Sequence, residues 1–170
     1  TLRDILVTMN PADIAGILEE AEEKDLPVVF RILPKELAAE VFSYMESDMQ
    51  QFLIEKFTDK ELKSVMDELF MDDAVDIIDE MPASVANRIL KQTDAATRKL
   101  INQLLAYPDD SAGSIMTTEY IDLKKNMTVS DAFERIRKIG TDTETIYTCY
   151  VTDRSRRLIG IVTVKDLLLN

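Results

Sequence analysis

The sequence predicts an α+β multidomain protein in which an all-α superhelix of short helix pairs is followed by a smaller α/β part. Two observations support this fold class. Over residues 1–107, helix-start signals recur at intervals of about 24 residues, each before apolar residues at helical spacing. After Gly113, segments rich in β-branched and aromatic residues alternate with a helical pattern. We place a linker at residues 108–117, where Pro, Asp, Ser and Gly cluster, and the α/β part at residues 118–170.

The helix starts of the first part follow the chemistry of N-terminal caps, in which a side-chain oxygen or a proline precedes the first turn. Two tetrapeptides also have the pattern of a capping box. In this motif the hydroxyl of the first residue accepts a hydrogen bond from the backbone N–H of the fourth, and the carboxylate or amide oxygen of the fourth accepts one from the backbone N–H of the first. The predicted caps and first-turn prolines are Asn10-Pro11, Asp25, Pro34, Ser47–Gln50, Thr58–Glu61, Pro82 and Thr93.

These starts define a repeat. Pro34, Thr58 and Pro82 are 24 residues apart, so one unit has room for two helices of about ten residues. A single pair of helices cannot bury its own apolar face, so neighbouring pairs must stack. We therefore expect a superhelix whose Leu and Met residues form the core.

The second part is predicted to contain strands over residues 119–123, 146–152 and 158–163. A helix is expected from Thr128 to about Ile139, where Gly140 ends it, and a last short helix begins at Val164.

Composition excludes several classes of protein. The chain has no His and one Cys, which excludes His-based catalysis, His-ligated zinc and an internal disulfide. Cys149 lies in an apolar run, where a buried structural thiol is expected. No nucleophile–base pair or glycine-rich phosphate loop is present, so we predict that the protein is not an enzyme. The longest uncharged stretch has nine residues, so we expect a soluble segment without direct membrane insertion.

Charge is distributed unevenly along the chain. Residues 1–107 carry 22 Asp and Glu against 11 Lys and Arg, whereas residues 108–170 carry 10 against 9. An acidic field repels nucleic acid and attracts cations, so no nucleic-acid partner is expected. The basic turn that contains Arg154, Arg156 and Arg157 is too small to change this; a solvated turn or a salt-bridge partner is favoured.

Asp72 and Asp76 are the metal candidates. Their spacing of four places both carboxylates on one helix face, where like charges cost a few tenths of a kcal/mol. A hard cation such as Mg²⁺ would relieve this repulsion while keeping several of its waters. The alternative is that these residues only complement the dipole at a helix N-terminus. The cluster of Glu19, Glu20, Glu22 and Glu23 reads as a solvated face.

Four segments of the second part have a common pattern, namely 115–117, 127–132, 150–153 and 158–166. They resemble a CBS motif, the regulatory module named for cystathionine β-synthase. Three more segments are distinctive, namely 33–42, 107–113 and 144–147. Together with the acidic helical repeat, they make nearly the whole chain resemble the N-terminal cytosolic region of the MgtE family of magnesium channels.

The resemblance implies a Mg²⁺-sensing regulatory region at the cytoplasmic face of the cell membrane, in which Asp72 and Asp76 share Mg²⁺ with neighbouring acidic residues. Mg²⁺-dependent compaction of the N and CBS domains would gate a pore. The implied partners are a second copy in a homodimer, and a second CBS motif and a transmembrane pore domain of the same protein beyond residue 170. Without a second motif, we expect residues 118–170 to self-associate or to be poorly ordered.

The resemblance also implies a weak nucleotide site. In CBS modules that bind adenine nucleotides, the turn that holds Thr163 and Asp166 here contacts phosphate and ribose, which implies ATP as a ligand. Thr148 stands where a stacking aromatic residue is expected. The residues alone are equally consistent with a helix cap. An adenine-nucleotide-sensing module and a helical-repeat interaction scaffold therefore remain alternatives.

Overall fold

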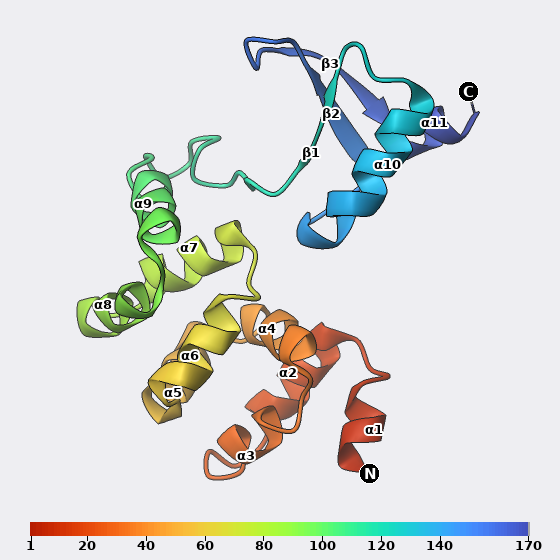
Figure 1. The fold of residues 1–170 in the computed structure, drawn as a ribbon. Helices are drawn as coiled ribbons and strands as arrows, with labels where there is room; N and C mark the ends of the chain where they lie inside the picture. The colour runs from red at the N-terminus through yellow and green to blue at the C-terminus, as the bar shows by residue number, and fades with distance from the viewer. Residues whose placement is uncertain (170) are drawn as a thin grey trace. The chain divides into compact units, whose positions relative to one another are not determined.

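The computed structural model describes residues 1–169 and divides the chain into two compact units (Figure 1). The first comprises Thr1–Ile115, and the second begins at Met116. Each unit has its own hydrophobic core, one wholly helical and one built on a small sheet. The predicted fold class is confirmed.

The first unit consists of nine helices within the described residues. They are α1 (Leu2–Leu6), α2 (Pro11–Glu19), α3 (Leu26–Phe30), α4 (Lys35–Ser43), α5 (Ser47–Lys56), α6 (Asp59–Met66), α7 (Met71–Glu80), α8 (Ala83–Gln92) and α9 (Ala95–Leu104). Helices α4, α6 and α8 begin at residues 35, 59 and 83, and α5, α7 and α9 begin at 47, 71 and 95. Both members of the helix pair therefore repeat every 24 residues, as the sequence predicts. In residues 1–169, each helix is too short or too polar to span a bilayer.

Several helix starts predicted from capping residues are confirmed by hydrogen bonds in the structure. The Asn10 side chain accepts a hydrogen bond from the Ala12 N–H at 3.0 Å, with Pro11 as the first residue of α2. Thr58 and Glu61 form the predicted capping box at the start of α6. These contacts satisfy N–H groups that have no partner within their own helix.

Other predicted caps are wrong. Helix α5 begins at Ser47 itself, and no side chain caps it. The Gln50 amide is instead buried and donates to the Phe42 carbonyl at 2.8 Å. Thr93 ends α8, and Asp94 caps α9 by accepting from two backbone N–H groups. Asp25 precedes α3 without a side-chain cap bond.

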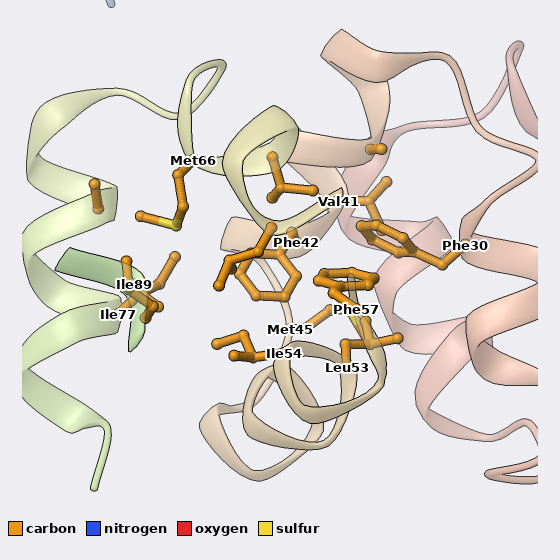
Figure 2. Packing of buried hydrophobic residues seen from close by; sticks show 14 of the residues in the cluster. Phe30, Val41, Phe42, Met45, Leu53, Ile54, Phe57, Met66, Ile77 and Ile89 are labelled. Carbon is orange, nitrogen blue, oxygen red and sulfur yellow. The ribbon is translucent and has the colours of Figure 1, made fainter. Parts of the chain in front are cut away.

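Aromatic rings form the centre of the helical core (Figure 2). Phe30, Phe42 and Phe57 approach one another with ring centroids 5.4–6.2 Å apart. The same continuous cluster extends to Ile77 of α7 and Ile89 of α8. Because one core joins successive helix pairs, the first unit is a single packed body rather than separate hairpins.

Arg88 links α8 to α5 and to the start of α6 through polar contacts. From α8, its guanidinium donates to the carbonyl oxygens of Ile54 at 2.5 Å and of Phe57 at 2.6 Å. It also lies 3.0 Å from the carboxylate of Asp59. The two carbonyls belong to the C-terminal end of α5, where backbone oxygens lack partners within the helix. Arg88 thus caps α5 from α8, three helices further along the chain.

The second unit is a three-stranded sheet with helices. It contains β1 (Ile121–Lys124), α10 (Val129–Ile139), the 3₁₀ turn η1 (Gly140–Asp142), β2 (Thr148–Thr152), β3 (Leu158–Thr163) and α11 (Val164–Leu169). The strand order is β1-β2-β3, with β1 and β2 parallel and β2 and β3 antiparallel. A parallel pair requires a crossover, which α10 supplies. Cys149 is fully buried in this core, as expected, and burial raises the pKa of its thiol.

The bounds of β1 and β2 differ from the prediction, and β1 also ends one residue later than expected. β1 and β2 each begin two residues later than expected, whereas β3 matches. Gly140 ends α10 in a right-handed conformation (φ −68°) and leads into the 3₁₀ turn, so its freedom to adopt positive φ is not used. β3 lies at the edge of the sheet and exposes Leu158 (61%) and Ile161 (62%).

Candidate functional site

Helix α7 presents the candidate metal-binding residues. Its Ala74, Val75, Ile77 and Ile78 side chains are buried in the helical core, which fixes the orientation of the helix. The helical period then places one row of carboxylates together. We define the α7 acidic face as Asp72, Asp76, Asp79 and Glu80.

Asp72 lies in the first turn of α7, where its charge complements the helix dipole. Its Oδ1 atom is buried and has no hydrogen-bond partner among the described residues. A buried carboxylate oxygen without a partner is energetically costly, by about 1–3 kcal/mol. One oxygen of the Asp72 carboxylate therefore lacks a compensating contact in the described structure.

Asp76 is four residues further along the same face. Partial removal of its carboxyl group from water raises its pKa, and repulsion from Asp72, Glu80 and Asp79 raises it further. Asp76 nevertheless remains exposed to solvent. The folded chain thus keeps an accessible carboxylate in a place where its charge is unfavourable, and a divalent cation would offset that cost.

Several positive side chains of the helical unit are paired with carboxylates outside this face. Arg31 binds Glu61, Lys35 binds Glu68, Lys63 binds Asp67, and Arg88 binds Asp59. No ion pair within residues 1–169 includes a member of the α7 acidic face. The acidic charge of this face is therefore not neutralised by the described part of the chain.

The α7 acidic face is not a closed metal site. The described residues contain no group of three or more His, Cys, Asp or Glu side chains placed to hold a metal ion. Mg²⁺ fits such an open arrangement, because it is commonly held by one or two carboxylates and keeps several waters. Asp79 and Glu80 were missed in the sequence analysis, although their spacing of three and four from Asp76 already places them on this face.

The candidate nucleotide residues lie in the second unit, where β3 leads into α11. Thr163 and Asp166 form a capping box: the Thr163 N–H donates to Asp166 Oδ2 at 2.9 Å, and the Asp166 N–H donates to Thr163 Oγ1 at 3.1 Å. The Thr163 hydroxyl also donates to Asp166 at 2.5 Å, and these bonds hold the pKa of Asp166 below its usual value. Thr148 pairs directly with Thr163 across the sheet. The structure therefore brings these three residues together at one end of β2.

Comparison with known proteins agrees with this architecture. Residues 9–110 match the family model of the MgtE intracellular N domain, and residues 112–170 match the CBS domain. The magnesium transporter MgtE of Thermus thermophilus is 33% identical over 172 residues, which cover 99% of this chain and 38% of that protein. MgtE of Bacillus subtilis is 26% identical over 167 residues, which cover 98% of this chain and 37% of that protein. The chain thus spans less than two fifths of the length of these relatives.

Two solved structures share the fold over 99% of this chain. The cytosolic domain of the Mg²⁺ channel MgtE in complex with ATP has a TM-score of 0.88 at 32% identity, and 69% of that chain is covered. The soluble part of a magnesium transporter has a TM-score of 0.90 at 26% identity, with 66% covered. All four relatives are named as magnesium transporters or channels, and none as an enzyme. The chain belongs to the MgtE family, as an MgtE intracellular N domain followed by a CBS domain.

Proposed function

We propose that this chain is the cytosolic Mg²⁺-sensing regulatory region of a magnesium transporter or channel, and that it gates a membrane pore belonging to the same full-length protein. The observation that carries the proposal is the α7 acidic face, with an unpartnered buried oxygen on Asp72 and an unfavourably placed carboxylate on Asp76. The named magnesium transporters and the Mg²⁺ channel among the relatives support the identity of the ion.

The mechanism follows from charge. At low Mg²⁺ the acidic helical domain repels other acidic groups, so the regulatory region is expanded. At high Mg²⁺ the ions bind carboxylates of α7 together with acidic groups from outside this face, and the N and CBS domains compact. A ligand shifts such an equilibrium only through its differential affinity for the two states. Because each open site binds weakly, several Mg²⁺ ions must act together.

The test is a Mg²⁺ titration of the 170-residue chain, followed through the backbone amide resonances of α7. The variant is Asp72→Asn/Asp76→Asn, and Glu36→Gln/Glu40→Gln is the matched control. The control removes the same charge from a pair with the same spacing on the exposed face of α4. We expect Mg²⁺ to shift the α7 resonances in the wild type and in the control but not in the Asp variant, with Na⁺ at equal ionic strength producing no shift.

Equal Mg²⁺ responses in the Asp variant and the wild type would remove Asp72 and Asp76 from the mechanism. Gating is tested in the full-length protein, where the Asp variant should lose protection of the cytosolic region from protease by millimolar Mg²⁺. Protection that persists in the variant would contradict the proposed compaction.

A second candidate function is adenine-nucleotide sensing by the CBS domain. It is favoured by the ATP complex of one relative and by the Thr163–Asp166 box at a strand-to-helix turn. Calorimetry with ATP, ADP and AMP tests it. Binding that Asp166→Ala abolishes would support the nucleotide function, and the absence of heat with all three ligands would reject it.

The proposal includes a homodimer and a second CBS motif as partners. The exposed apolar side chains of β3, among them Leu158, Ile159 and Ile161, favour coverage by another sheet. Light scattering tests the self-association of the 170-residue chain: a dimer is expected, and a monomer at all concentrations would contradict it. A pure interaction scaffold would instead show no response to Mg²⁺.

A further inference from the structure

A pocket of about 410 Å³ lies at the carboxyl ends of two parallel strands in the second unit. β1 ends at Lys124 and β2 ends at Thr152, and these two residues are paired across the sheet. The segments that follow both strands therefore leave the sheet at the same edge. In open α/β sheets, ligands bind in the crevice outside the carboxyl ends of the strands. We name this cavity the β1–β2 basic pocket; it is lined by Lys124, Lys125, Asn126, Thr152, Asp153 and Arg154.

Positive charge is concentrated around this pocket. Residues 108–170 contain nine Lys and Arg, and five of them lie either at the last residue of β1 or in the segments that follow β1 and β2. These five are Lys124, Lys125, Arg154, Arg156 and Arg157. Three of the five line the cavity itself. A concave surface lined by one sign of charge raises the local concentration of the opposite ion.

Asp153, the one acidic side chain in the lining, is hydrogen-bonded within its own turn. Its Oδ1 atom accepts hydrogen bonds from the backbone N–H groups of Ser155 at 2.8 Å and Arg157 at 2.9 Å. These bonds hold the carboxylate on the β2–β3 turn. Asp153 therefore shapes the pocket wall, and the cations outnumber it.

The cations of the pocket differ in their freedom to bind a ligand. The Lys124 ammonium group is held by Asp122 at 2.8 Å and by the Thr152 hydroxyl at 2.7 Å. Lys125 and Arg154 are exposed, and within residues 1–169 neither side chain has an ion-pair partner. The pocket thus combines one oriented ammonium group with two cations that are available to an anion.

We propose that the β1–β2 basic pocket binds an anion that carries several phosphate groups. A guanidinium group matches phosphate oxygens in a two-pronged geometry, and an ammonium group binds phosphate as a point charge. The Asn126 side chain adds a neutral donor. A cavity of this size suits a small ligand. The bound phosphates belong either to a free polyphosphate or to the headgroup of an anionic lipid.

This pocket is separate from the Thr163–Asp166 turn. Thr163 pairs with Thr148 at the first residue of β2, whereas the basic pocket begins at Thr152, the last residue of that strand. Four residues of strand span about 13 Å. A variant at one position can therefore be used to test the other independently, and the inference does not depend on Mg²⁺ sensing.

The experiment measures phosphate binding to the 170-residue chain in metal-free buffer at low ionic strength. One arm uses calorimetry with inorganic tripolyphosphate, and the other uses co-sedimentation with phosphatidylcholine vesicles that contain phosphatidylinositol bisphosphate, whose headgroup carries several phosphate groups. The test variant is Lys125→Ala/Arg154→Ala. The control is Arg137→Ala/Lys138→Ala, which removes the same charge from the last turn of α10, at the opposite end of the crossover helix.

We expect the test variant to weaken binding by about tenfold or more, because two charge-assisted contacts are lost, and the control to retain nearly wild-type affinity. Binding in either arm with this pattern supports the proposal and identifies the source of the phosphate. Absence of binding in both arms would overturn it. An equal loss in the test variant and the control would also overturn it, because that result indicates attraction by net charge alone. An Asp166→Ala variant should bind as the wild type does.

Discussion

Replacing Asp76 by Asn should stabilise the first unit when divalent cations are absent. Asp76 has three acidic neighbours at helical spacing, namely Asp72, Asp79 and Glu80. Each like-charge pair of this kind destabilises a helix by about 0.2–0.5 kcal/mol, so removal of the Asp76 charge should contribute about 1 kcal/mol. For a unit the size of Thr1–Ile115, this corresponds to an increase of about 4 °C in the unfolding midpoint.

The pH dependence of this gain has a definite sign. The pKa of Asp76 in the folded chain lies above the ordinary value of 3.8, so the folded state binds the proton more tightly than the unfolded state. Stability therefore falls as pH rises from the ordinary value through the raised pKa, and the full cost remains at neutral pH. Asp76→Asn should thus gain most at neutral pH, and the gain should disappear below the ordinary pKa.

Glu61→Gln is a control variant for which the expected change in stability has the opposite sign. The bidentate contact with Arg31 and the bonds to Thr58 lower the pKa of Glu61 from 4.5 to about 2. A lowered pKa contributes stability above the unfolded value, and this contribution is lost as pH falls toward the folded value. Because both partners are partly exposed, the benefit is screened, but Glu61→Gln should still destabilise the chain at neutral pH.

Thermal unfolding followed by circular dichroism measures both variants, at neutral and acid pH, with a chelator and then with Mg²⁺. Mg²⁺ should raise the midpoint of the wild type more than that of Asp76→Asn. A midpoint of Asp76→Asn at or below that of the wild type, in chelator at neutral pH, would refute the reasoning. So would a gain of equal size at acid pH.

Two further predictions concern residues outside the α7 acidic face. Arg88→Met should destabilise the first unit by about 2–3 kcal/mol in urea unfolding, because the carbonyls of Ile54 and Phe57 lose a charged donor; an unchanged urea midpoint would show that water replaces it. Gly113→Ala should make the chain more sensitive to protease near residues 107–115, because a methyl group at Gly113 would overlap the ring of Tyr107. An unchanged cleavage rate would mean that the ring moves aside at no cost.

The helical repeat could be predicted from sequence because its information is local. Thr58 and Glu61 are three residues apart, and their capping box needs no distant partner. The pattern at Ser47 is equally good, yet Gln50 bonds to the Phe42 carbonyl in the preceding helix instead. Local chemistry offers both arrangements, and only packing against α4 selects between them.

The candidate sites likewise depend partly on local sequence and partly on tertiary packing. The spacing of Asp72 and Asp76 was sufficient to place them on one face, but the burial of the Asp72 oxygen depends on tertiary packing. The basic pocket was not predicted because Lys124 and Thr152 are far apart in sequence. Parallel pairing of β1 with β2 brings them together, and the residue patterns of the strands do not give the order of strands in the sheet.

The link that Arg88 makes between helix pairs has a mechanical consequence. In a helical array that bends at each hairpin, the movement of one helix would change the angle to the next helix and would not reach the rest of the array. Here a guanidinium group bonded to the end of α5 and a continuous aromatic and aliphatic core oppose bending between the pairs. These contacts join successive helices, so that a displacement of one helix of the first unit would carry its neighbours with it.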